Sequence, residues 1–279
     1  MTSIDAGPRP RPTESARSML LTVLGEFVLP GECAVWTGTL VDALGLLGFA
    51  DGNARQAIAR MGEDGLITAV KHGRRTRWHL SPEGERLLDN GAQRIYGLGR
   101  RRAEWNHRWL VVVCSIPETQ REKRRRLQTQ LQFAGFGFLA PSIAVSPHVS
   151  AESTASDVLR RLELTDTAMV FRAETGELTA DGDLVRRSWD LDELARTYEE
   201  FTATFAPVRP DGDAGAFTHV VRLVHAWRRF PFADPDLPTE LLPADWAGAA
   251  ARILFDDARG AWRPPAIAHY ERLEEAHGG

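Results

Sequence analysis

The sequence predicts an α+β protein with an N-terminal winged helix-turn-helix, a central ferredoxin-like domain and a helical C-terminal domain. Two observations carry this prediction. Three helical segments precede two short strands in the first hundred residues, and the next stretch has the order strand, helix, strand, strand, helix, strand. The rest of the chain has helical periodicity. We expect a disordered arm over residues 1–14 and domains over residues 15–99, 100–181 and 182–279.

The composition is that of an ordinary globular protein. Of the 279 residues, 43% are hydrophobic and 26% are charged, which is too apolar for general disorder. Because the formal net charge is -4, any surface that binds nucleic acid must be local. The chain has only two cysteines, Cys33 and Cys114, and no apolar run of about 18 residues. We therefore expect a cytoplasmic, reducing location and no membrane span.

The first two helices are predicted from caps and from apolar spacing. Ser15 is a suitable N-cap for a first helix that Pro30 and Gly31 end. A second helix is expected over residues 35–49, with Trp36 and Thr37 at its start. The residues at helical spacing that should face a common core are Met19, Leu20, Val23, Leu24, Phe27, Leu40, Val41, Leu44 and Leu47.

A third helix and a hairpin complete the N-terminal part. On a helical wheel of residues 50–65, the apolar residues share one narrow side. Two strands, 66–71 and 75–80, are joined by a basic turn in which Gly73 can adopt a positive φ. Ser81 then caps a fourth helix. The narrow apolar side consists of Ala54, Ala57, Ile58 and Met61, which leaves Asn53, Arg55, Gln56 and Arg60 outside it.

The central and C-terminal parts are predicted more coarsely. Residues 109–116 form an apolar run of strand length, typical of a strand that is buried on both faces. A charged amphipathic helix and a strand pair follow. Asp190 is a suitable cap for a later helix. The residues expected to pack on these two helices are Leu127, Leu131, Phe133, Leu191, Leu194, Tyr198 and Phe201.

Three helices followed by a two-stranded wing indicate a DNA-binding domain. In that design the third helix enters the major groove and the hairpin lies against the backbone. Arginine pairs with a guanine edge, and glutamine or asparagine with adenine, so we predict base readout by Asn53, Arg55, Gln56 and Arg60. We predict phosphate contacts from Trp36, Thr37, Thr39, Lys71, His72, Arg74 and Arg75. The expected partner is double-stranded operator DNA.

Several segments of the chain are similar to those of the PaaX-type regulators, the repressors of phenylacetic acid degradation. The text "ARQAIARMGEDGLI" resembles the family's recognition helix, "GRRTRWHLSPEG" its wing, and "DPDLPTELLPADW" its C-terminal signature. The resemblance implies a dimeric transcriptional repressor of an aromatic acid catabolic operon, released by an acyl-CoA effector such as phenylacetyl-CoA. Gly52, Asn53 and Gln56 depart from the family pattern, so the resemblance does not assign the operator sequence.

An acyl-CoA thioester requires cations beside an apolar slot, because it carries phosphates and an acyl tail. The segment "HAWRRF" has this mixture, so we predict effector binding by His225, Trp227, Arg228 and Arg229. Residues 121–126, "REKRRR", offer cations without the slot. Binding would hold the two wings of a dimer at a spacing that no longer fits the half-sites.

Two other classes of function remain open. The ferredoxin-like pattern of the central domain also resembles small CRISPR-associated endoribonucleases, which are metal-dependent. The resemblance implies an acidic metal ligand at the end of the first strand, where Cys114 and Ser115 stand here. A DNA-binding module without a ligand is the other. His219 and His225 lack the spacing and the further ligands of a zinc site, and the chain has no P-loop. We therefore expect no enzymatic activity, no metal and no cofactor.

Overall fold

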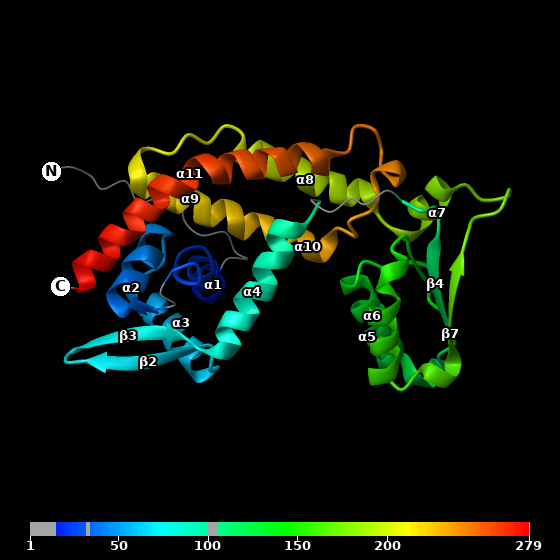
Figure 1. Ribbon diagram of the computed structural model, residues 1–279, viewed down its shortest axis with the longest axis horizontal. Coiled ribbons are helices and arrows are strands. Elements are labelled where there is room, and N and C mark those ends of the chain that lie inside the picture. Colours follow the sequence, from blue (N-terminus) through cyan, green and yellow to red (C-terminus); the bar gives the residue numbers. More distant parts are fainter. Residues whose placement is uncertain (1–14, 32–33, 100–104, 279) are drawn as a thin grey trace. The chain divides into compact units, whose positions relative to one another are not determined.

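The computed structural model describes residues 15–31, 34–99 and 105–278. The arm predicted over residues 1–14 and Cys33 lie outside the described residues. The protein is α+β and divides into two compact units (Figure 1). The first unit takes its described residues from Met1–Gly97, Ala203–Arg228 and Ile253–Gly279, and the second from Leu98–Thr202 and Arg229–Arg252. The domain boundaries expected at residues 99 and 181 stay predictions.

The first unit begins with the predicted helices. Ser15 caps α1 (Ala16–Val23), and its side chain accepts a hydrogen bond of 3.1 Å from the Ser18 N–H, as predicted. A π-helical segment (Leu24–Val28) continues α1. Next come α2 (Thr37–Leu46) and α3 (Asp51–Glu63). The nine residues predicted to face a core from the first two helices are all buried.

Glycines end both α2 and α3 in the same way. Gly48 and Gly65 have φ angles of 94° and 72°, in the left-handed region that favours glycine. After each glycine the next N–H reaches back into the helix, from Phe49 to the Leu44 carbonyl (3.1 Å) and from Leu66 to the Met61 carbonyl (3.0 Å). These Schellman motifs turn the chain sharply. As a result α3 starts close to the end of α2, and a strand starts directly after α3.

The hairpin is present and has an unpredicted third strand. The strands β2 (Ile67–His72) and β3 (Arg75–Leu80) pair antiparallel around a turn in which Gly73 has a φ of 62°, as predicted. The short strand β1 (Ala34–Trp36) pairs with the other edge of β3, so the order is β1-β3-β2. The sequence pattern assigned residues 35–36 to the second helix. They form a strand because β3 offers them a partner.

The core of the first unit is completed by distant parts of the chain. Ser81 caps α4 (Pro82–Gly97), accepting the Gly84 N–H at 3.0 Å, as predicted. The helix α9 (Gly212–Trp227) and residues 253–278 of α11 (Ala247–Gly278) belong to the same unit. Their core residues pack with those of α1, α2 and α3, and they are Ala216, Phe217, Val220, Val221, Ala266 and Tyr270.

A buried carboxylate joins the first helical stretch to α11. Glu26, in the π-helical segment, is 2% exposed and lies 3.0 Å from Arg259 and 3.6 Å from Arg263. Burial raises the pKa of the Glu26 carboxyl, and the two guanidinium groups oppose that rise. The contact therefore fixes the position of α11 on this part of the unit more than it adds net stability.

The central part has the predicted order of elements. The strands β4 (Trp109–Cys114), β5 (Gly137–Ala140), β6 (Ile143–Ser146) and β7 (Ala168–Ala173) form an antiparallel sheet of order β5-β6-β4-β7. The helices α5 (Arg121–Phe133) and α6 (Glu152–Arg161) pack on it through a core that includes Leu110, Val112, Leu127, Leu131 and Val158. Phe133 is half-exposed, so the prediction that it packs in this core is wrong; it stacks on Phe232 instead.

The remaining helices of the second unit are short or continue into the first unit. They are α7 (Asp181–Ser188), α8 (Leu191–Phe205) up to Thr202, and α10 (Phe230–Ala233). Asp190 caps α8 by accepting the Glu193 N–H at 2.9 Å, as predicted. Tyr198 donates to Asp234 at 2.6 Å and stacks on Phe230 at 4.0 Å, so the apolar side of α8 is buried.

Two glycines of α4 provide a matched test of this packing. A Cβ at Gly84 would overlap the backbone carbonyl of Leu66, whereas nothing lies within 4 Å of a Cβ at Gly91. We expect Gly84→Ala to lower the free energy of unfolding by about 1–3 kcal/mol through overpacking. Gly91→Ala should raise it by about 0.5–1 kcal/mol, because alanine restricts the unfolded chain. Urea unfolding measures both, and equal effects at the two positions would contradict the described packing.

Candidate nucleic-acid interface

The face of α3 that points away from the core carries the residues predicted to read bases. Ala54, Ala57, Ile58 and Met61 are all at most 5% exposed. Because these four fill one side of the helix, the other side faces solvent. The exposed residues there include Asn53, Arg55, Gln56 and Arg60.

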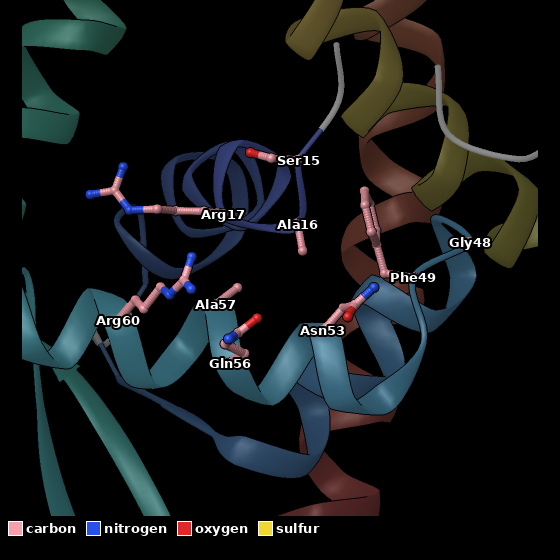
Figure 2. Close-up of a pocket in the computed structure, with 9 residues that line it drawn as sticks. All are labelled: Ser15, Ala16, Arg17, Gly48, Phe49, Asn53, Gln56, Ala57 and Arg60. Carbon is pink, nitrogen blue, oxygen red and sulfur yellow. The ribbon is translucent and has the colours of Figure 1, made fainter. Parts of the chain in front are cut away.

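A cleft of about 400 Å³ runs between this face of α3 and the start of α1. Figure 2 shows Arg60 extending from α3 towards α1, with Asn53 and Gln56 further along the same helix. Arg17 of α1 also lines the cleft and pairs with Asp64 at 2.7 Å. The cleft is lined by Ser15, Ala16, Arg17, Gly48, Phe49, Asn53, Gln56, Ala57 and Arg60.

Arg17 is a candidate contact that the sequence analysis missed. It lies 43 residues before Arg60, and only the packing of α1 on α3 brings both arginines to one cleft. One feature of the sequence could have pointed to it. Arg17 lies in the first turn of α1, just after the Ser15 cap, where the helix dipole does not favour a cation.

The tip of the hairpin is basic and exposed. Lys71, His72, Arg74 and Arg75 all have exposed side chains around the Gly73 turn. Arg75 also donates to the backbone carbonyl of His277 at 2.7 Å. Because Lys71 and His72 at the end of β2 and Arg74 in the turn are also exposed, the tip forms a basic patch.

The start of α2 differs from the sequence prediction. Thr39 is fully buried, and its hydroxyl donates to the Leu273 carbonyl at 3.3 Å, so phosphate cannot reach Thr39 while α11 lies in this position. The Thr37 hydroxyl donates to the Thr76 carbonyl at 3.1 Å and accepts from the Trp78 indole at 2.9 Å. Trp36 donates its backbone N–H to the Glu274 carboxylate at 3.1 Å. These donors already have partners within the chain.

The segment predicted to bind an effector is packed rather than open. Trp227 is 1% exposed, donates to the Ile95 carbonyl at 3.1 Å and stacks on Phe255 at 4.5 Å. The prediction that Trp227 lines an apolar slot is therefore wrong, because Phe255 fills the space beside its ring. Arg228 donates to the Ser18 carbonyl at 2.8 Å, so it holds α9 to α1.

The other two residues of that set lie in different surroundings. The Nδ1 atom of His225 lies 3.2 Å from the Thr22 hydroxyl, and burial beside Arg228 lowers the pKa of the imidazole to about 4. Arg229 belongs to the second unit and donates to the Thr197 carbonyl at 3.2 Å. A neutral His225 attracts no phosphate at pH 7, whereas the exposed guanidinium of Arg229 can.

The basic run over residues 121–126 is paired locally. Arg121 and Arg124 each lie 3.0 Å from Glu118, and Arg125 lies 2.8 Å from Glu122. Exposed pairs of this kind contribute little energy, but they reduce the local positive charge.

Cys114 stands where the sequence analysis looked for a catalytic group in the second unit. The strand β4 ends at Cys114, which is buried, and burial raises the pKa of its thiol despite a weak contact with Thr167. A raised pKa makes a thiol a poor nucleophile. No group of three or more His, Cys, Asp or Glu residues in the described part of the chain could hold a metal ion. Within the same residues, no helix has the length and apolarity needed to cross a bilayer.

Three family models cover most of the chain. Residues 15–84 match the model described as PaaX-like protein, residues 102–185 the PaaX protein central Cas2-like domain, and residues 189–272 the PaaX-like protein C-terminal domain. The chain belongs to the PaaX family. The resemblance seen in the recognition-helix, wing and C-terminal segments is thereby confirmed.

One curated relative and one solved structure extend this comparison. The transcriptional repressor PaaX of Escherichia coli (strain K12) is 29% identical, over 95% of this chain and 86% of its own length. The uncharacterized protein Rv0674 from Mycobacterium tuberculosis has a similar fold, with a TM-score of 0.66 over 93% of this chain and 98% of its own. At 22% identity, that second likeness concerns the fold alone.

The surroundings of His225 predict how the stability of the protein depends on pH. Because the pKa of its imidazole is lowered to about 4, His225 stays neutral in the folded protein at pH values between about 4 and 6.5. In the unfolded chain the imidazole has its ordinary pKa near 6.5 and binds a proton in that range. Its contribution to stability is therefore present above pH 6.5 and is lost as the pH falls towards 4. We expect the histidine NMR titration to show a midpoint near 4 for a signal that disappears in His225→Gln. A midpoint near 6.5 for that signal would contradict the packed environment.

Proposed function

We propose that this protein is a DNA-binding transcriptional repressor whose N-terminal part is a winged helix-turn-helix. One observation carries the proposal: Asn53, Gln56 and Arg60 form an exposed row along α3, in the same unit as a basic hairpin tip. Membership of the PaaX family supports it, because the E. coli relative is named a transcriptional repressor.

The proposed mode of binding follows from helix and groove dimensions. The major groove of B-DNA admits an α-helix, and α3 has a free polar face. Arg55 and Arg60 suit guanine edges, and Asn53 and Gln56 suit adenine edges. The wing tip, with Lys71, His72, Arg74 and Arg75, would then lie against the phosphates, which position the protein without reading sequence. Arg17 adds a further cation in the cleft that Asn53, Gln56 and Arg60 line.

The wider architecture is part of the same proposal. We assign a winged-helix domain to residues 15–99, a ferredoxin-like domain to residues 100–181 and a helical domain to residues 182–279. The order of elements in each part supports this assignment. We further propose a cytoplasmic homodimer that binds a palindromic operator, because two-fold symmetry in the protein matches two half-sites in the DNA.

The effector remains an acyl-CoA thioester such as phenylacetyl-CoA, and the target an aromatic acid catabolic operon. The family membership supports both. The packing of Trp227 moves the proposed contact to exposed cations such as Arg229, with His225 and Arg228 in structural roles. An effector that binds the DNA-binding conformation less tightly than another conformation shifts the equilibrium away from the DNA-binding one.

Substitution of single arginines separates base readout from phosphate contact. On a DNA site selected from a random library, Arg60→Ala should weaken binding by about 1–3 kcal/mol and relax the preference at one base pair. Arg74→Ala should weaken binding to all sequences alike and reduce the salt slope by about one. Fluorescence anisotropy at several salt concentrations measures both effects.

Arg209→Ala is the matched control, because this exposed arginine donates only to carbonyls of its own turn, those of Ala206 and Val208. It should leave affinity and salt slope unchanged. Equal losses in all three variants would mean that only net charge matters, and would overturn the assignment of α3.

In the same titration phenylacetyl-CoA should lower the affinity for the selected site, whereas free coenzyme A should not.

A further inference from the structure

The end of α11 lies on the part of the first unit that the sequence assigns to phosphate binding. The Glu274 carboxylate accepts the Trp36 N–H at 3.1 Å, at the start of α2. The carbonyl of His277 accepts from Arg75 of the wing at 2.7 Å. The Leu273 carbonyl accepts from the Thr39 hydroxyl at 3.3 Å. Three predicted phosphate donors thus bind acceptors of one helix end.

The fit between the two helix ends is close. A Cβ at Gly38, in the first turn of α2, would overlap the imidazole of His277. The other side of that imidazole is held, since its Nε2 lies 2.7 Å from Asp42 of α2. A residue larger than glycine at position 38 would therefore displace the His277 imidazole from this contact.

The charges at this contact are those of a phosphate site. The start of a helix carries a partial positive charge and favours anions. Arg77 of β3 lies over the Trp36 ring, with 5.6 Å between its guanidinium carbon and the ring centroid. Both Arg77 and Glu274 act on the buried phenol of Tyr270, whose pKa is raised by burial and by Glu274 and lowered by Arg77. Glu274 thus supplies a negative charge where a DNA phosphate is expected.

We propose that the last turns of α11, residues 273–278, act as a built-in competitor of DNA phosphate. With them in place the start of α2 and Arg75 are occupied, and DNA gains these contacts only when the helix end moves away. This proposal rests on the proposed function. The measured affinity for DNA is then reduced by the fraction of molecules in which the helix end is bound.

The alternative role for the same contact is that the end of α11 supports DNA binding. If the helix end held Arg75 and the start of α2 in the shape that DNA needs, its removal would weaken binding. The two roles predict opposite changes in DNA affinity when the helix end is removed, so a binding measurement decides between them.

The experiment compares the full chain with Glu274→Gln and with a chain that ends at Arg272. Both variants should bind the selected DNA site more tightly, by on the order of fivefold or more. Their salt slope should be steeper by about one, because a further phosphate contact forms. Glu271→Gln, which removes an exposed charge from the same helix, is the control and should change the affinity far less. Circular dichroism confirms that each variant is folded.

Unchanged or weaker binding in Glu274→Gln, while the full chain binds normally, would overturn the competitor role whatever the shortened chain does. Tighter binding in Glu271→Gln of equal size would show a general charge effect and would also overturn it. If the full chain and every variant fail to bind any DNA, the proposed function fails and this inference falls with it.

Discussion

The burial of one narrow side of α3 is the constraint on which the rest of this structure depends. Ala54, Ala57, Ile58 and Met61 pack into the core of the first unit, and two of them are alanines, which let the helix approach its neighbours closely. A helix fixed on so narrow a side must present its remaining residues to solvent. The polar row of Asn53, Gln56 and Arg60 is exposed for this reason, and the Gly48 and Gly65 turns set the direction in which it is presented.

The DNA-binding candidate and the C-terminal helices share one core. Phe217 of α9 packs against Phe27 at 5.0 Å, and Tyr270 of α11 stacks on the same ring at 5.2 Å. Glu26 and Arg228 add polar contacts between the same segments. A shift of α9 or α11 therefore changes the surroundings of α1, α2 and the β2–β3 hairpin directly. That coupling gives the proposed repressor a physical route by which a change elsewhere in the chain alters its DNA-binding surface.

The sequence predicted those features that local chemistry determines. The caps at Ser15, Ser81 and Asp190 and the turn at Gly73 each depend on a few neighbouring residues, and all four are confirmed. The apolar side of α3 is confirmed because helical spacing fixes which residues share a side. The element order of the central part is confirmed for the same local reasons.

The features that were missed depend on contacts between distant parts of the chain. Strand β1 exists because β3 lies beside it, and Thr39 is buried because residues of α11 cover it. Arg17 reaches the α3 cleft only through helix packing. Trp227 illustrates a different limit, since an aromatic residue beside arginines has the same sequence pattern whether it lines an open slot or packs on Phe255.

The central claim is that the outer face of α3 lies in the groove of bound DNA, and affinity cleavage tests it most directly. An iron chelate attached to Gln56→Cys, in a Cys33→Ser background, should cut the selected DNA site within the protected region. The same chelate on Asp257→Cys, an exposed position of α11, should cut it weakly or not at all. Strong cleavage from position 257 with none from position 56 would contradict the account.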